Sequence, residues 1–138
     1  MRLTLEKAII LKSVDLFSSV PEMELASVAA ILKEIEVVAG DDIIVEGEIG
    51  STMYVIVAGK VRVHRGGRDV AILGDREVFG ELATLDPAPR SATVTALAGT
   101  ELLELSAAAL LELLTDHPGV TRGIFRVLCA RLRAASAS

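Results

Sequence analysis

Apolar positions recur with a helical period in the first quarter of the chain. The clearest stripe has the spacing i, i+3, i+4 and i+7 and consists of Leu25, Val28, Ala29 and Leu32. This spacing places the four side chains on one face of a helix. Pro21 and Glu22 precede the stripe and are typical of a helix start. A shorter helix is predicted before it, with an apolar face formed by Leu5, Ala8, Ile9 and Leu11.

The pattern changes between Glu36 and Leu105, where short runs rich in Val and Ile alternate with glycines. These runs predict strands over residues 36–38, 42–45, 53–57, 61–64, 69–73, 92–97 and 102–105. Residues 64–68, with Gly66 and Gly67 at their centre, predict the tip of a hairpin. Several short strands separated by turn signals favour an all-β sandwich or barrel.

A helical period returns at Ser106, a residue suited to cap a helix. After a break at residues 116–119, a last helix is predicted from near Pro118, and its apolar face would be formed by Val120, Ile124, Val127, Leu128 and Leu132. The chain is therefore predicted to be one domain of residues 1–138. Its parts would be N-terminal helices in residues 1–35, a β-barrel in 36–105 and C-terminal helices in 106–133.

Composition and charge exclude several classes of protein. Aromatic residues make up only 3% of the chain, so the core is expected to be aliphatic. The net charge is −5 with no block of Lys and Arg, so nucleic-acid binding by this chain alone is not expected. No apolar run approaches the roughly 20 residues of a membrane span, and no signal peptide begins the chain, so the expected location is cytoplasmic. Cys129, the only cysteine, is expected to be a small buried apolar residue.

One segment of the predicted barrel, residues 79–94, breaks the strand pattern. Residues 80–85 lack alternation and predict one or two helical turns. Gly80 would let the backbone approach a ligand closely. The N–H groups of Leu82 and Ala83 would be free at the start of this short helix, where an anion is favoured.

The residues that follow these turns carry complementary chemistry. Pro87 and Pro89 end the helix, and Arg90 comes directly after them. A guanidinium can donate two hydrogen bonds to two phosphate oxygens, and the Ser91 hydroxyl adds another donor. The Glu81 carboxylate accepts hydrogen bonds, so its natural partner is a sugar hydroxyl. The set fits a ligand with an anionic end and a hydroxylated ring.

This segment resembles the phosphate-binding cassette of the cyclic nucleotide-binding domain family. The cassette reads approximately Phe-Gly-Glu-Leu-Ala, a short spacer, and Pro-Arg-(Ser/Ala/Thr)-Ala-x-Val, and residues 79–83 and 89–94 match it without a gap. Further matches to the early strands are at residues 40–41, 46–47, 50, 53–56 and 59–61. Two positions depart from the family pattern: Arg76 stands where glycine is frequent, and Ser51 where an acidic residue is frequent.

The resemblance implies a fold and a set of roles. The fold would be mainly β with flanking helices, an eight-stranded jelly-roll barrel closed by C-terminal lid helices. Glu81 would accept a hydrogen bond from the ribose 2′-hydroxyl, and Arg90 would pair with the cyclic phosphate. The rest of the ligand shell would comprise the backbone near Gly80, Leu82, Ala83 and Ala92, the hydroxyl of Ser91, and Val70 beside the base. Arg131 or Arg133 of the last helix could stack on the base.

The resemblance favours cAMP, because Ser91 occurs in bacterial cAMP binders, whereas Thr at this position is frequent in cGMP-preferring members. A cGMP-preferring domain is one alternative, and a barrel that binds no nucleotide and serves as a protein-interaction module is another. A third alternative is a transcription factor of the related bacterial type, which would need a helix-turn-helix after the last predicted helix. The sequence ends at Ser138 and predicts no such element, so the effector and the oligomeric state stay open.

Catalysis is the main rival from another class. Metal enzymes on small barrels need clustered His and carboxylate ligands, and the two His residues, His64 and His117, are far apart in the sequence. No Ser-His-Asp arrangement is available either. The sequence therefore predicts a protein without enzymatic activity, metal or cofactor.

Overall fold

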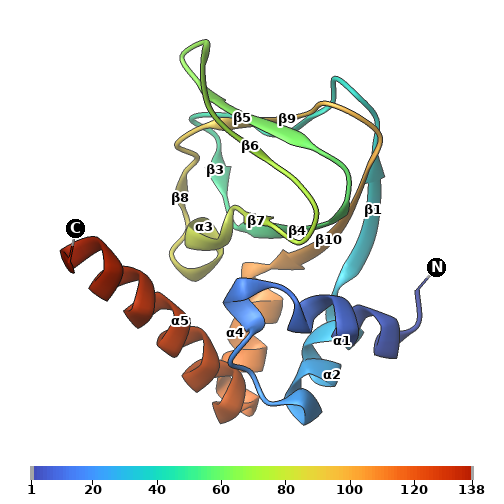
Figure 1. The fold of residues 1–138 in the computed structure, drawn as a ribbon, viewed down its shortest axis with the longest axis vertical. Coiled ribbons are helices and arrows are strands. Elements are labelled where there is room, and N and C mark those ends of the chain that lie inside the picture. Colours follow the sequence, from blue (N-terminus) through green and yellow to red (C-terminus); the bar gives the residue numbers. More distant parts are fainter. Residues whose placement is uncertain (1, 138) are drawn as a thin grey trace. The chain divides into compact units, whose positions relative to one another are not determined.

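Helices at both ends of the chain flank a central run of strands in the computed structural model, which describes residues 2–137 (Figure 1). The elements divide into two compact units. A helical unit comprises the chain up to Ile31 and from Leu111 onward, and a β unit comprises Leu32–Leu110. Antiparallel sheets with flanking helices are the fold class that the sequence predicted.

The helical unit is built on the apolar stripes of its helices. These elements are α1 (Thr4–Lys12), η1 (Asp15–Phe17), α2 (Glu22–Ile31), the end of α4 (Ala107–Asp116), and α5 (Pro118–Ala137). In α2, the predicted residues Leu25, Val28 and Ala29 are all buried. In α5, Val120 and Ile124 are buried, and Gly123 packs so closely on Ser19 that a Cβ there would lie 2.9 Å from its carbonyl oxygen.

The predicted apolar face of α1 is confirmed at Leu11 but is wrong at Leu5 and Ile9. The helix buries Ile10 and Leu11, whereas Leu5 and Ile9 are 71% and 66% exposed. The helix has only nine residues, and the chain turns at Ser13 directly after it. Burial is therefore concentrated in the last helical turn, next to the buried residues of η1.

The prediction that Cys129 is buried is also wrong, because the structure exposes it. Val127 is the last buried residue of the α5 stripe, and Cys129 follows two positions later. A helix turns by about 100° per residue, so Cys129 points away from the buried face. Leu132, predicted to be on the apolar face, is 68% exposed as well.

The β unit contains two four-stranded antiparallel sheets and one two-stranded sheet. The strand orders are β1-β10-β4-β7, β2-β9-β5-β6 and β3-β8. The strands are β1 (Lys33–Val37), β2 (Asp42–Ile44), β3 (Ile49–Gly50), β4 (Thr52–Ala58), β5 (Val61–Arg65), β6 (Arg68–Leu73), β7 (Val78–Phe79), β8 (Ala88–Pro89), β9 (Thr93–Ala96) and β10 (Thr100–Ser106). Each of the seven predicted strands has a counterpart, whereas β3, β7 and β8, with two residues each, were not predicted.

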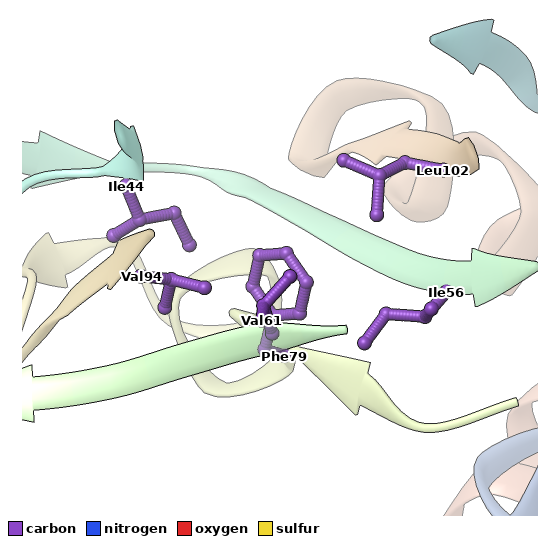
Figure 2. Packing of buried hydrophobic residues seen from close by; sticks show 6 residues of the cluster. All are labelled: Ile44, Ile56, Val61, Phe79, Val94 and Leu102. Carbon is purple, nitrogen blue, oxygen red and sulfur yellow. The ribbon is translucent and has the colours of Figure 1, made fainter. Parts of the chain in front are cut away.

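The core of the β unit joins the two larger sheets (Figure 2). One sheet contributes Ile56, Phe79 and Leu102, and the other contributes Ile44, Val61 and Val94. Phe79 is the only aromatic residue of this buried cluster, in line with the predicted aliphatic core. Because Phe79 opens the cassette segment, its burial fixes the start of that segment to the barrel core.

The predicted hairpin tip joins β5 to β6. Gly66 and Gly67 have φ angles of +56° and +79°, and the residues on either side, Arg65 and Arg68, face each other in register. A two-residue turn with two positive φ angles matches the twist of the strands and suits glycine at both positions.

Candidate functional site

Residues 79–94 form a short helix and a return strand. Helix α3 (Glu81–Leu85) begins after Gly80, whose φ is +81°, and the Thr84 hydroxyl donates to the Gly80 carbonyl oxygen over 3.1 Å. A Cβ on Gly80 would lie 2.7 Å from the carbonyl oxygen of Thr52, so both the conformation and the close approach need glycine here. The predicted helical turns are therefore present, with Glu81 at their start.

The backbone of Arg90 is paired to the loop between β2 and β3. The Arg90 N–H donates to the Glu48 carbonyl oxygen over 2.8 Å, and the Gly47 N–H donates to the Arg90 carbonyl oxygen over 2.9 Å. The N–H and C=O groups of Arg90 are thus both hydrogen-bonded, so the backbone that carries the Arg90 side chain is held in place.

The guanidinium of Arg90 lies over Gly50. A Cβ on Gly50 would overlap the Nε and Cζ atoms of Arg90, and it would come within 2.6 Å of Nη2. Nη2 donates to the carbonyl oxygen of Thr52 over 2.7 Å. Gly50 and Thr52 therefore form a backbone cradle that sets the plane of the guanidinium.

The other terminal nitrogen of Arg90, Nη1, is buried and has no hydrogen-bond partner within residues 2–137. It is near Gly80, since it would lie 3.0 Å from a Cβ built there. A buried donor without a partner costs about 1–3 kcal/mol, and more for a charged group. Such a donor beside the start of α3 calls for an acceptor from outside the chain, and an anion is the acceptor that a guanidinium binds best.

Ser91 and Ala92 continue from Arg90 toward β9. Ser91 is exposed, and its carbonyl oxygen accepts a hydrogen bond from Arg65 Nε over 2.7 Å. Ala92 is buried, with 9% of its surface exposed. Arg65 and the cradle formed by Gly50 and Thr52 were not assigned to the site from the sequence.

Tyr54 lies on β4, an inner strand of one sheet, and its ring contacts the first residue of the cassette, Phe79. Its ring stacks on Phe79 with the centroids 5.2 Å apart and an angle of 22° between the planes. Burial raises the pKa of the Tyr54 hydroxyl, the charge of Glu104 and a hydrogen bond to it raise the pKa further, and the charge of Arg90 lowers it. The Arg90 charge therefore acts on the ring that packs against the first cassette residue.

The other predicted side chains belong to β6, α3 and α5. Val70 on β6 stands at a register shift and is 56% exposed, and Leu82 on α3 is 70% exposed. Arg131 and Arg133 belong to the helical unit, where Arg131 Nη2 donates to Asp15 Oδ2 over 3.2 Å.

Within residues 2–137 there is neither a cluster suited to a metal ion nor a helix suited to span a membrane. No group of three or more His, Cys, Asp or Glu side chains there is arranged to hold a metal ion. No helix in the same range combines the length and apolar character needed to cross a bilayer.

Comparison with known proteins points to one family. The family model described as cyclic nucleotide-binding domain matches residues 34–117. A CRP-like cAMP-activated global transcriptional regulator of Mycobacterium tuberculosis is 30% identical over 129 residues, which cover 90% of this chain and 58% of that protein. The chain spans about half the length of the curated relatives that it matches.

Solved structures show the same likeness. The N-terminal domain of a transcriptional regulator from Streptomyces coelicolor has a TM-score of 0.84 and 34% identity, with 93% of this chain and 92% of that chain covered. The regulatory domain of Toxoplasma gondii PKA, solved with cAMP, has a TM-score of 0.74 and 32% identity, with 80% of this chain and 44% of that chain covered.

Proposed function

Because this chain belongs to the cyclic nucleotide-binding domain family, we propose that it is a regulatory module that binds cAMP through residues 79–94. The observation that carries the proposal is the guanidinium of Arg90. One of its terminal nitrogens is held by Thr52, and the other is buried without a partner within residues 2–137. A cyclic phosphate would supply the missing acceptor.

The ligand shell follows from the chemistry of each group. Arg90 and the Ser91 hydroxyl would meet the phosphate, together with backbone N–H groups of Leu82, Ala83 and Ala92. Gly80 would leave room for this approach, and Glu81 would accept from the ribose 2′-hydroxyl. Because Arg90 Nη1 has no access to solvent in the free chain, capture of a phosphate oxygen requires a small shift of the guanidinium or of the cassette.

The choice of cAMP rests on Ser91 and on two relatives. The relative from M. tuberculosis is named as cAMP-activated, and the T. gondii regulatory domain was solved with cAMP. The alternative is cGMP, for which a Thr hydroxyl at position 91 would be the expected signal. A barrel that binds neither nucleotide and serves only as an interaction module is the second alternative, and the unpartnered Arg90 nitrogen argues against it.

The proposed lid is the second half of α5. The first half is engaged in the helical unit through Val120 and Ile124, whereas Leu132 is exposed and Leu128 is partly buried. Apolar side chains of this kind are suited to cover the base, with Val70 on its other side. Arg133 or Arg131 would stack on the base, and Arg131 would first have to leave Asp15.

We further propose that the module is cytoplasmic and non-catalytic, and that it passes ligand occupancy to an effector. The comparison proteins named above are a transcriptional regulator and a kinase regulatory domain, so the effector is either a further domain or a separate protein. The ligand would act by shifting an equilibrium between open and closed forms of the lid.

Calorimetric titration with cAMP and with cGMP tests the proposal. We expect binding of both nucleotides, with cAMP the tighter ligand. Arg90→Ala should weaken cAMP binding by about 2–5 kcal/mol, because it removes one partner of a charge pair. Arg68→Ala is the matched control, since it removes the same charge from an exposed hairpin position. Unchanged affinity in Arg90→Ala, in a variant shown to be folded by circular dichroism, would refute the assignment.

A further inference from the structure

We propose that Arg65 is a positioning residue of the nucleotide site, which holds the Ala92 amide toward the ligand phosphate by binding the Ser91 carbonyl oxygen. This inference rests on the proposed function. It adds a residue from the β5–β6 hairpin that neither the cassette motif nor the sequence pattern assigns to the site.

The geometry begins with the pairing of β5 and β9. These strands are antiparallel, and their last paired residues are His64 and Thr93. Arg65 is the next residue of β5, and its side chain extends the contact beyond the ladder. Its Nε donates to the carbonyl oxygen of Ser91 over 2.7 Å, across 26 positions of sequence.

The hairpin tip that carries Arg65 is itself fastened. The Gly66 N–H donates to Glu46 Oε1 over 3.2 Å, and the Glu46 N–H donates to the Thr93 hydroxyl over 3.0 Å. Glu46 therefore connects the tip to the first residue of β9. The tip, the loop after β2 and the return strand of the cassette form one closed set of hydrogen bonds, so the Arg65 side chain starts from a fixed backbone.

The peptide unit between Ser91 and Ala92 transmits this contact. A trans peptide is planar, and its C=O and N–H groups point in opposite directions. A donor that fixes the Ser91 carbonyl therefore also fixes the direction of the Ala92 N–H, which is one of the proposed phosphate donors. A charged donor on the carbonyl also polarises the amide, so that its N–H becomes a stronger donor.

The hairpin offers an internal control for simple charge effects. Arg68 lies directly opposite Arg65 in register, on the other side of the two-residue turn, and is exposed. A chain with a net charge of −5 repels an anionic ligand at long range, and either arginine would weaken that repulsion. Only Arg65 has the contact to Ser91. A difference between the two positions therefore separates positioning from general attraction.

The experiment compares wild type, Arg65→Ala, Arg65→Lys and Arg68→Ala by calorimetry with cAMP at low and high salt. We expect Arg65→Ala to bind about 3–10-fold more weakly, a range reduced from that of a buried charged hydrogen bond because Arg65 is exposed. Arg65→Lys should recover most of the affinity, since an ammonium can donate to the same carbonyl. Arg68→Ala should stay within about twofold of wild type.

Amide NMR spectra provide a readout that general loss of stability does not move. In wild type, cAMP should shift the Ala92 amide proton downfield as it donates to the phosphate. In Arg65→Ala this shift should be smaller, while Arg68→Ala should keep it in full.

The outcomes distinguish this inference from the proposed function. If wild type binds neither cAMP nor cGMP, both are overturned. If wild type binds cAMP but Arg65→Ala and Arg68→Ala lose equal affinity, or the ligand-induced shift of Ala92 is the same in all variants, Arg65 has no positioning role and the nucleotide site stands without it.

Discussion

Arg90 shows how much of the proposed binding site is built by residues that offer only backbone. The orientation of its guanidinium is set by a hydrogen bond to the carbonyl oxygen of Thr52 and by the space that Gly50 leaves because it has no side chain. Neither residue would bind the ligand, yet together they decide where the guanidinium points. A guanidinium held close to its binding position before the ligand arrives loses less conformational entropy on binding, even where a small shift is still required, and this favours affinity.

Substitution of Gly50 should separate affinity from stability. In Gly50→Ala the new Cβ would overlap the guanidinium of Arg90, which is the far end of a flexible side chain and can move aside. We expect a small change in unfolding free energy, but cAMP affinity reduced by about tenfold or more, because charge-assisted hydrogen bonds are displaced. Calorimetry and urea unfolding measure the two effects.

Gly99→Ala is the matched control for this substitution, since a Cβ at Gly99 would meet no atom within 4 Å. It should leave both quantities unchanged. Equal cAMP affinity in Gly50→Ala and Gly99→Ala would show that Gly50 does not seat the guanidinium.

Arg76 gives a physical reason for a departure from the family pattern. Its φ is +68°, and it is the only residue other than glycine with a positive φ within residues 2–137. Glycine adopts this conformation without strain, which explains its frequency at this position in the family. Here the Arg76 side chain offsets part of the strain, since its Nη1 donates to the Val57 carbonyl oxygen over 2.8 Å.

At the scale of elements, the longer strands were predictable and the shortest were not. Residues 53–57 and 61–64 were predicted as strands from their β-branched side chains between glycines. The observed strands β4 and β5 have nearly the same bounds. By contrast, β3, β7 and β8 have two residues each, and β8 contains Pro89. These short strands pair with segments far away in the sequence, so a pattern of neighbouring residues does not reveal them.

The candidate site divides in the same way. The sequence can propose Arg90 and Glu81 because the motif places them in one continuous segment. The contacts of Arg90 with Gly50 and of Ser91 with Arg65 join residues that are far apart in the chain, and no periodicity links them. The burial of only the last turn of α1 could not be predicted, because the spacing of apolar residues does not show which helical turn packs against another element.

Helix α5 provides its own probe of the proposed lid. Cys129 is the only cysteine, it is exposed, and it lies in the half of the helix that would close. If cAMP draws this half over the base, the surroundings of Cys129 change, so a thiol reagent should modify Cys129 at a different rate in the presence of cAMP. The reaction can be followed with an aromatic disulfide, and 5′-AMP at equal concentration serves as the control ligand. Equal rates with and without cAMP would count against lid closure.

Folding stability is a property of the whole molecule, and Tyr54 makes part of it depend on pH. Burial and the neighbouring Glu104 raise the pKa of Tyr54 above its ordinary value of 10.0, despite the opposing charge of Arg90. The folded chain thus holds the phenol proton more tightly than the unfolded chain. This contribution to stability is complete below about pH 10, and it is lost as the pH rises through the folded-state pKa.

Urea unfolding at about pH 8 and about pH 11 measures this dependence. We expect stability to fall between the two values, with a smaller fall in Tyr54→Phe, which keeps the ring stacked on Phe79 but has no proton to lose. Other groups respond to pH in both proteins, so only the difference between the two proteins is informative. The same fall in both would show that Tyr54 does not contribute.

The stacking of Tyr54 on Phe79 has one more consequence. The chain contains a single tyrosine and no tryptophan, so its emission comes from one ring when it is excited at wavelengths that phenylalanine does not absorb. The centroid of that ring lies 5.2 Å from the ring centroid of Phe79, the first cassette residue, and the charge of Arg90 lowers the pKa of its hydroxyl. Without any attached label, the natural fluorophore of this protein is located where a change at the proposed nucleotide site would alter its surroundings.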